Sequence, residues 1–111
     1  MNKSKQKGTA AESSVVKTMN ANGWEAVERR ALQGALDKGD IAGLPRVVIE
    51  VKDQNALSFG PWLKEAQVER DNAQADIGVV WAKRRGFTDA SKWFVVMDGE
   101  TFMKMLKEGG R

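Results

Sequence analysis

The stretch that decides the fold is GDIAGLPRVVIEVKD, residues 39–53. It predicts two short strands joined by a turn over residues 43–46, because glycine and proline separate two apolar segments. Side chains of a strand alternate between its two faces, so Glu50 and Lys52 are expected on the same face. The opposite face of the second strand is expected to carry Val47, Ile49 and Val51.

Glu50 and Lys52 are unusual because they lie within an apolar run, where charged side chains are rarely tolerated without partners. Asp40 opens the preceding strand in this interpretation, so its carboxylate can lie beside that of Glu50. Two ionised carboxylates about 4 Å apart repel by roughly 4 kcal/mol at an effective dielectric of 20, and a bound divalent cation reverses this repulsion. The pattern therefore predicts a metal site, with an edge strand that has one solvated face as the alternative.

Two further residues fit such a site. Lys52 is expected to stay charged beside two carboxylates, where it can contact an attacking water or a phosphate. Glu12 lies at the border of the apolar face of a predicted helix, from which it can complete a metal shell directly or through water. Glu12 also stands three residues after Thr9, so a capping-box glutamate is an alternative that can coexist with the metal role.

The residue types that are missing narrow the chemistry. The chain contains no histidine and no cysteine, which excludes Ser-His-Asp and Cys-His catalysis, HExxH metalloproteases, disulfides and cysteine-ligated metal centres. Catalysis would have to use carboxylates, lysine and a metal. Hard cations bound through oxygen, Mg²⁺ or Mn²⁺, are the natural companions of that set.

The whole chain predicts an α/β protein with the order α-β-β-β-α-β-β-α, a mixed sheet covered by helices. Helices are expected over residues 8–22, 60–73 and 99–107. Strands are expected over residues 24–30, 76–83 and 93–97 besides the two in the opening stretch, with loops over 32–38 and 83–92. The second helix is expected to pack through Leu63, Ala66 and Arg70, and the third through Phe102, Met105 and Leu106.

Composition indicates one soluble domain. The 111 residues are 41% hydrophobic and 30% charged, close to the averages for globular proteins. A single domain over residues 1–111 is expected, with a flexible basic arm over 1–7 and a frayed tail over 108–111. No apolar run suits a bilayer and the lysine-rich start lacks a signal peptide's apolar stretch, so we expect a cytoplasmic protein without a membrane partner.

The segments KGTAAE, GWEAVERR, GDIAGL and VVIEVKD, over about residues 7–53, resemble archaeal and phage Holliday junction resolvases of the PD-(D/E)XK nuclease superfamily. The resemblance implies a restriction-endonuclease-like fold, Mg²⁺- or Mn²⁺-dependent cleavage of branched DNA, a homodimer and no small-molecule cofactor. If the chain is encoded by a phage, it would act in the host cytoplasm. The resemblance maps the family's metal site and catalytic lysine onto Glu12, Asp40, Glu50 and Lys52.

The chain departs from the family pattern at two places. Gly39 stands where the family's motif has proline before the aspartate. Leu32-Gln33-Gly34 stands where many archaeal resolvases place a serine, and this bears on junction specificity more than on the nuclease fold. Gln67, on the second predicted helix, resembles a polar residue often found near such sites.

Basic side chains are the candidates for DNA contact. The net charge is +3 and the pI about 9.3, which suits a polyanionic partner. Phosphate contacts are expected from separate segments of the chain. The candidates are Lys7, Arg29, Arg30, Lys83, Arg84 and Arg85, each with a solvated surface charge as the alternative.

The leading functional prediction is a homodimeric, Mg²⁺-dependent endonuclease that resolves Holliday junctions by paired phosphodiester hydrolysis. A nuclease of the same fold that acts on flaps or unbranched DNA is one alternative. A noncatalytic DNA-binding module with this fold is another, and a basic protein-interaction domain is a third.

Overall fold

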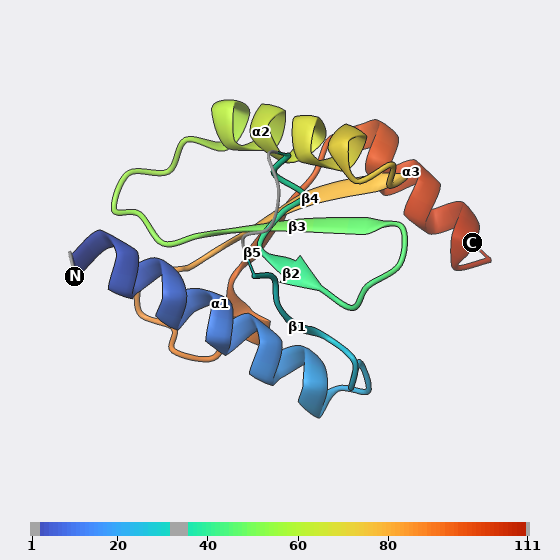
Figure 1. The fold of residues 1–111 in the computed structure, drawn as a ribbon. Helices are drawn as coiled ribbons and strands as arrows, with labels where there is room; N and C mark the ends of the chain where they lie inside the picture. The colour runs from blue at the N-terminus through green and yellow to red at the C-terminus, as the bar shows by residue number, and fades with distance from the viewer. Residues whose placement is uncertain (1–2, 32–35, 111) are drawn as a thin grey trace.

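The computed structural model describes residues 3–31 and 36–110 and shows an α/β arrangement (Figure 1). The predicted order of helices and strands is confirmed, with one 3-10 helix added. The elements are α1 (Lys3–Ala21), β1 (Glu28–Arg29), β2 (Ile41–Ala42), β3 (Val47–Lys52), α2 (Phe59–Asn72), β4 (Ile77–Ala82), η1 (Ala90–Lys92), β5 (Phe94–Val96) and α3 (Gly99–Glu108).

The central sheet has three strands in the order β3-β4-β5. Strands β3 and β4 are parallel and in register from Val47 opposite Ile77 to Lys52 opposite Ala82. Strand β5 runs antiparallel to β4, so the sheet is mixed as predicted. Strands β1 and β2 form a separate antiparallel pair. A hydrogen bond from the backbone N–H of Asp40 to the carbonyl of Ile49, 3.0 Å long, connects this pair to β3.

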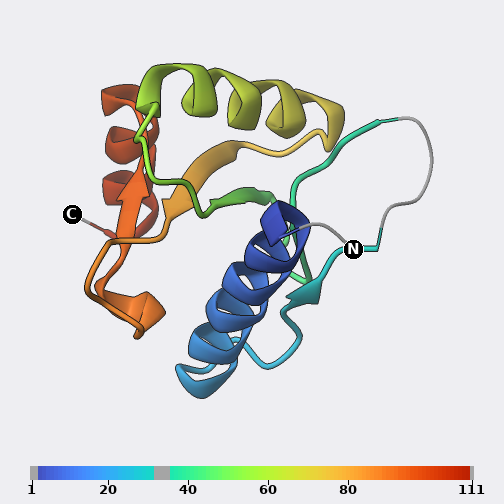
Figure 2. The ribbon, with the colours of Figure 1, turned by 90° about the vertical axis from the view of Figure 1, so that its left-hand side faces the viewer.

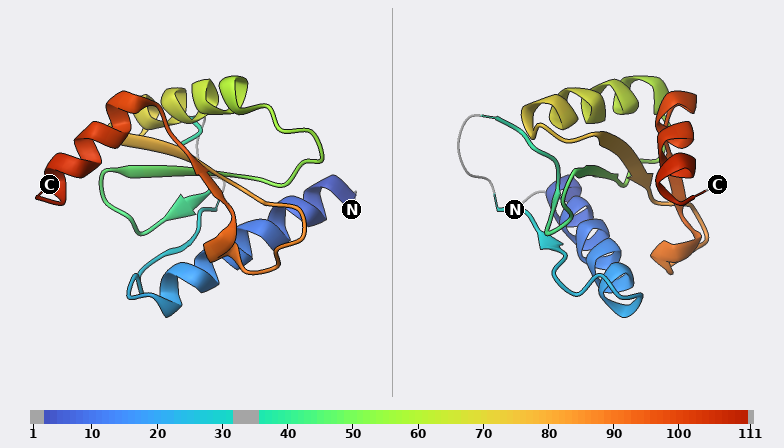
Figure 3. Two further views of the ribbon diagram at one scale, coloured as in Figure 1. Left: turned by 180° about the vertical axis from the view of Figure 1, so that it is seen from behind. Right: turned by 90° about the vertical axis from the view of Figure 1, so that its right-hand side faces the viewer.

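Helix α1 covers one face of the sheet and α2 covers the other, as the views from the side and from behind show (Figures 2 and 3). The α1 face is apolar because Val15 and Met19 pack with Ile49 and Val51 in one cluster, to which the buried Trp93 also belongs. The alternation predicted for β3 is therefore confirmed on this face. Burial of these side chains is the main source of stability on the α1 side.

Helix α2 packs against the opposite face through a different set of residues. Trp62 and Ala66 form a small apolar cluster with Val80 and Ala82 of β4. The third buried residue of α2 is Glu69, one turn after Ala66. The α2 face of the sheet is thus partly apolar and partly ionisable.

Two glycines let the segment before β3 pass close to other backbone. Gly39 has φ +93°, and a Cβ there would lie 2.8 Å from Cγ1 of Val48 and 3.2 Å from the carbonyl oxygen of Ile49. Proline fixes φ near −65°, so it cannot replace Gly39 in this backbone. Gly43 has φ +88°, and its Cβ would lie 2.1 Å from the carbonyl oxygen of Ala26.

Several predicted boundaries were wrong. Helix α1 begins at Lys3, not at residue 8, so residues 3–7 are helical where a flexible arm was expected and Thr9 lies inside the helix, not at its N-cap. The first strand is limited to Glu28–Arg29. At the other end, Glu108 still belongs to α3 and pairs with Arg46 at 3.0 Å.

The predicted packing faces of the later helices also differ from the structure. On α2 the buried row runs through Trp62, Ala66 and Glu69, so the predicted row was rotated by about one position. On α3 two of the expected inward residues are exposed, Phe102 to 53% and Met105 to 42%, while Leu106 is half-buried and Thr101 is buried. Within the described residues, no helix has the length and apolarity needed to cross a membrane.

Candidate metal centre

Four carboxylates meet between β3 and α2. Each of them offers an oxygen within 4.8 Å of the others. Glu50 comes from the middle of β3, Glu65 and Glu69 come from α2, and Asp37 comes from the segment before β2. Residues four apart on a helix share a face, which is why α2 can supply two of them.

Two of these carboxylates are buried and have oxygens without a hydrogen-bond donor. The exposed fraction is 6% for Glu50 and 2% for Glu69. Oε2 of Glu50 and both side-chain oxygens of Glu69 are inaccessible to solvent and lack a donor. An isolated buried carboxylate is costly and is normally neutralised, paired or bound to a metal. Both residues belong to the cluster, so a cation bound there would supply a partner for these carboxylates.

The electrostatics of the cluster favour protonation in the absence of a cation. Burial, followed by the interaction with Glu69, raises the pKa of Glu50 to about 9. Burial also raises the pKa of Glu69 to about 7, with the charges of Asp37, Asp40 and Glu65 adding to the effect. At neutral pH these two glutamates are therefore at least partly protonated, unless a bound cation takes the place of the protons.

Asp40 lies directly beside this cluster, as expected from the sequence. Its Oδ2 accepts a hydrogen bond from the backbone N–H of Val51 at 2.8 Å, which fixes the carboxylate against β3. Burial, and next the charge of Glu50, raise the pKa of Asp40 to about 8. The predicted pair of Asp40 and Glu50 is therefore present in the structure.

Lys52 lies on the same face of β3 as Glu50, as predicted. Its Nζ is 3.0 Å from Oε2 of Glu65 and 3.8 Å from Oε1 of Glu50. Burial opposes its charge, but the hydrogen bond to Glu65 and the charge of Glu50 outweigh burial and raise the pKa of Lys52. The lysine remains an ammonium group at the edge of the carboxylate cluster.

Glu12 is near the site but outside the group of four carboxylates. Its Oε1 accepts a hydrogen bond from Nε of Arg29 at 3.2 Å, so one candidate metal ligand is paired with one candidate DNA contact. The charge of Glu12 also contributes to the raised pKa of Asp40. Glu12 thus lies within electrostatic range of the site, at the α1 side.

The other basic candidates are distributed around this region. Arg30 donates through Nη2 to the carbonyl of Ile41 at 3.3 Å. Lys7 and Lys83 both approach Asp53, at 3.9 and 3.8 Å. Arg84 stacks on aromatic rings, and Arg85 lines the same pocket as Lys7 and Lys83. The backbone N–H of Lys83 donates to the carbonyl of Lys52 at 2.8 Å, so residues 83–85 begin beside the end of β3.

Gln67 points away from the carboxylates. Its Nε2 donates to Oδ2 of Asp98 at 3.0 Å. The other oxygen of Asp98 accepts from the backbone N–H of Thr101 at 2.8 Å and caps α3. Gln67 therefore connects α2 to the start of α3. The Leu32-Gln33-Gly34 segment lies outside the described residues.

Sequence reasoning missed Asp37, Glu65 and Glu69. A signal for the two glutamates existed in the spacing: they are four residues apart on α2, an arrangement in which like charges repel on a helix surface. Glu69 also follows Trp62 and Ala66 at helical spacing, which would place it on the buried face. No comparable periodicity marks Asp37, because it lies in an irregular segment.

The donor set fits a hard divalent cation. All the candidate ligands are carboxylate oxygens, the ligands that Mg²⁺ and Mn²⁺ prefer, and the buried oxygens of Glu50 and Glu69 lack other partners.

Comparisons of this chain with protein-family models, with curated proteins and with solved structures found no match.

Proposed function

We propose that this chain is a metal-dependent DNA endonuclease of the PD-(D/E)XK type, with branched DNA as its substrate. The observation that carries the proposal is the convergence of Asp37, Glu50, Glu65 and Glu69 between β3 and α2, beside Lys52. The negative charges of neighbouring carboxylates repel one another, and a divalent cation bound between them would stabilise all of them. A neighbouring lysine adds a positive charge suited to a phosphate.

The residues have separate roles in the proposed reaction. Glu50, Glu65, Glu69 and Asp37 would hold Mg²⁺ or Mn²⁺. Such an ion supplies an activated water and neutralises charge on the phosphoryl oxygens. Asp40, held by the N–H of Val51, would keep the carboxylate of Glu50 in place and accept a proton from the attacking water.

Lys52 would position the scissile phosphate. In the structure its ammonium group is held by Glu65 and Glu50, which restricts its position before a substrate arrives. A fixed positive charge is worth more in catalysis than a mobile one because it costs no reorganisation during the reaction. Glu12 belongs to the same proposal as a ligand through water, on the side where it meets Arg29.

Resolution of a four-way junction requires two active sites related by symmetry, so the proposal includes a homodimer. Large apolar side chains are exposed on α3 and β5, namely Phe102, Met103, Met105 and Val95. Apolar surface exposed to this extent is a feature of protein contacts, and these side chains support the proposed association of two copies. Light scattering of the purified chain would test this part of the proposal.

The deciding experiment is cleavage of a labelled four-way junction beside a linear duplex of matched sequence, in Mg²⁺. Wild type would be compared with Asp40→Asn, Glu69→Gln and Glu100→Gln. Glu100 is an exposed carboxylate on α3 outside the cluster, so it controls for the loss of a negative charge. Paired nicks in the junction, lost in the first two variants and kept in the third, are the expected result.

Other outcomes would redirect the proposal. Equal cleavage of both substrates would keep the nuclease and reject the preference for branched DNA. Tight DNA binding without cleavage in Mg²⁺ or Mn²⁺, unchanged by Asp40→Asn, would reject catalysis and indicate a binding module.

A further inference from the structure

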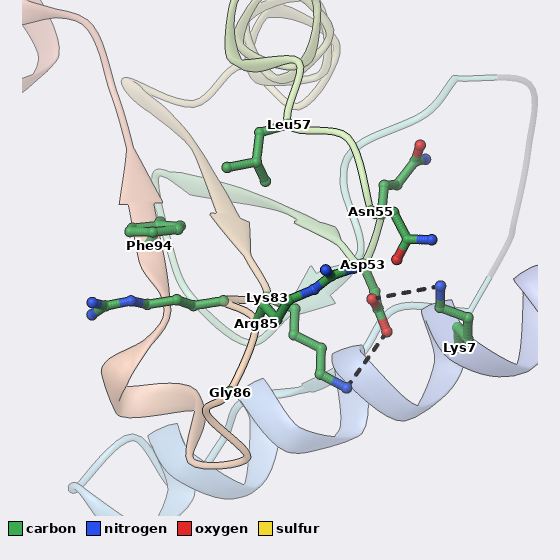
Figure 4. A pocket seen from close by; sticks show the side chains of 10 residues that line it. Lys7, Asp53, Asn55, Leu57, Lys83, Arg85, Gly86 and Phe94 are labelled. Atoms are coloured by element: carbon green, nitrogen blue, oxygen red, sulfur yellow. Dashed lines mark ion pairs between the residues drawn. The ribbon is translucent and has the colours of Figure 1, made fainter.

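A pocket lies at the C-terminal ends of β3 and β4. It has a volume of about 690 Å³, within the range of roughly 300–1,000 Å³ that is usual for small-ligand sites. Its walls come from α1, from the segment between β3 and α2, from the segment after β4 and from β5 (Figure 4). The crevice outside the carboxyl ends of parallel strands is a common place for ligands in α/β proteins.

The charges of this pocket suit a phosphate. Lys7, Lys83, Arg84 and Arg85 line it, against the single carboxylate of Asp53. Asp53 lies between the two lysines, which approach it at 3.9 and 3.8 Å and remain about half exposed (Figure 4). Distances close to 4 Å and exposed ammonium groups describe weak pairs, so both lysines can turn toward an incoming anion.

The apolar part of the pocket suits a ring. Phe94 and Leu57 line it and are exposed to 37% and 50%, although each is large and apolar. Phe59 contacts Phe94 edge-on, with ring centroids 6.1 Å apart, which fixes the orientation of the Phe94 ring. The guanidinium of Arg84 lies 5.3 Å from the same ring and offers a second planar group.

We propose that this pocket binds an unpaired nucleotide of a DNA strand, with its base against Phe94 and its phosphate between Lys83 and Arg85. A base within a duplex exposes its edges but not its faces, so an aromatic ring can stack on it only after it has left the helix. Combined cations and an exposed aromatic ring are the usual features of single-strand binding sites. The pocket therefore selects DNA in which pairing is interrupted.

The pocket is coupled to the candidate active site through the backbone. Asp53 follows Lys52 directly, and the N–H of Lys83 donates to the carbonyl of Lys52 at 2.8 Å. A nucleotide held here would lie next to the phosphate contacted by Lys52. The position of the nucleotide beside the scissile bond rests on the proposed nuclease function. Binding of an unpaired nucleotide here would explain why the nuclease acts near a branch point.

The test is a binding measurement in EDTA, where no cleavage can occur. Fluorescence anisotropy would compare a short oligothymidylate with a paired duplex of the same length, for wild type, Phe94→Ala, Phe94→Leu and Trp24→Ala. Trp24 is an exposed aromatic residue after α1 that does not line the pocket, which makes it the matched control. Circular dichroism would verify that each variant is folded.

We expect Phe94→Ala to weaken binding of the oligothymidylate by roughly five- to hundredfold, because stacking on one aromatic ring is worth about 1–3 kcal/mol per base. Phe94→Leu should lose most of the same affinity although it keeps an apolar side chain and so preserves the fold. Duplex binding, and all binding by Trp24→Ala, should stay within about twofold of wild type.

Three outcomes would overturn the inference. Equal single-strand binding by wild type and by both Phe94 variants would remove the ring from the site. Equal losses for single strand and duplex would show that the pocket holds backbone only. Competition by thymidine monophosphate as strong as that by the oligonucleotide would assign the pocket to free nucleotides. A chain that never cleaves DNA but shows the expected Phe94 pattern would reject the nuclease and keep the pocket.

Discussion

The two faces of β3 show how one strand serves two purposes. Toward α1, Ile49 and Val51 are buried in a purely apolar cluster. Toward α2, Glu50 is buried just as deeply but among carboxylates that raise its pKa. The first face contributes free energy to folding, whereas the second costs free energy that the proposed cation would offset. Adjacent residues with equal burial can therefore have opposite effects on stability.

The sharpest way to separate the two faces is Glu50→Gln. We expect cleavage to fall by roughly a thousandfold or more, since an electrostatic contact to the reacting groups is commonly worth at least a hundredfold. The metal-free protein should be at least as stable as wild type at pH 8, because a buried ionisable group is removed. Single-turnover cleavage and thermal melting in EDTA would measure both. A large loss of stability in EDTA would contradict the comparison.

On the opposite face, Ile49→Ala should do the reverse. Removing most of a buried isoleucine costs about 2–5 kcal/mol from lost burial and the cavity left behind. Urea unfolding would measure this loss. Cleavage per folded molecule should change little, because Ile49 points away from the carboxylates. An activity loss that persists under conditions in which the variant is fully folded would show that the two faces are coupled.

A third prediction concerns the approach of Gly39 to β3. Gly39→Ala should destabilise the protein by about 1–3 kcal/mol from its positive φ, plus the contacts of the new Cβ with Val48 and Ile49. Gly86→Ala is the matched control because Gly86 has a similar φ of +87° with no atom within 4 Å of the added Cβ. The difference between the two variants, measured by chemical denaturation, isolates the contact with β3. Equal costs would show that this contact yields easily.

A further expected effect is a pH dependence of stability. The pKa values of Glu69, Asp40 and Glu50 are about 7, 8 and 9 in the folded chain, against ordinary values near 4 in an unfolded chain. Between these limits the folded chain binds more protons than the unfolded chain. The contribution of these three groups to stability is therefore complete below about pH 4 and is lost as the pH rises toward 9.

Melting in EDTA at pH 6 and pH 9 would measure this effect, and a decrease of roughly 5 °C or more is expected. Mg²⁺ or Mn²⁺ should raise the melting temperature more at pH 9 than at pH 6, because the ion competes with protons. Glu69→Gln should weaken both trends. A metal-free protein that becomes more stable with rising pH would contradict the assignment of buried, mutually repelling carboxylates.

Much of this arrangement follows from local sequence patterns. Alternation in the 47–52 segment is enough to separate Ile49 and Val51 from Glu50 and Lys52, and the short turn before it brings Asp40 back beside the strand. These are consequences of strand geometry over a few residues. The α/β order was predictable for the same reason, since each element has its own apolar period.

The contributions of the helices were harder to predict because a helix turns by about 100° per residue. An error of one position in the buried row of α2 exchanges Glu69 for Arg70, and the candidate ligand is then missed. On α3 the apolar period was correct, but a period shows which residues share a face and not what that face contacts. Phe102 therefore remained exposed where the sequence suggested a core position.

The parallel pairing of β3 with β4 has a consequence for how the chain folds. The two strands are joined only through α2, which packs on both of them, so strand, helix and strand form one continuous unit in the middle of the sequence. Loop closure within such a unit costs less entropy than bringing distant segments together. We expect this unit to form early and to bring Glu50, Glu65 and Glu69 together before α1 closes over the other face. Metal present during refolding would then accelerate folding itself, and stopped-flow refolding with and without Mg²⁺ would measure it.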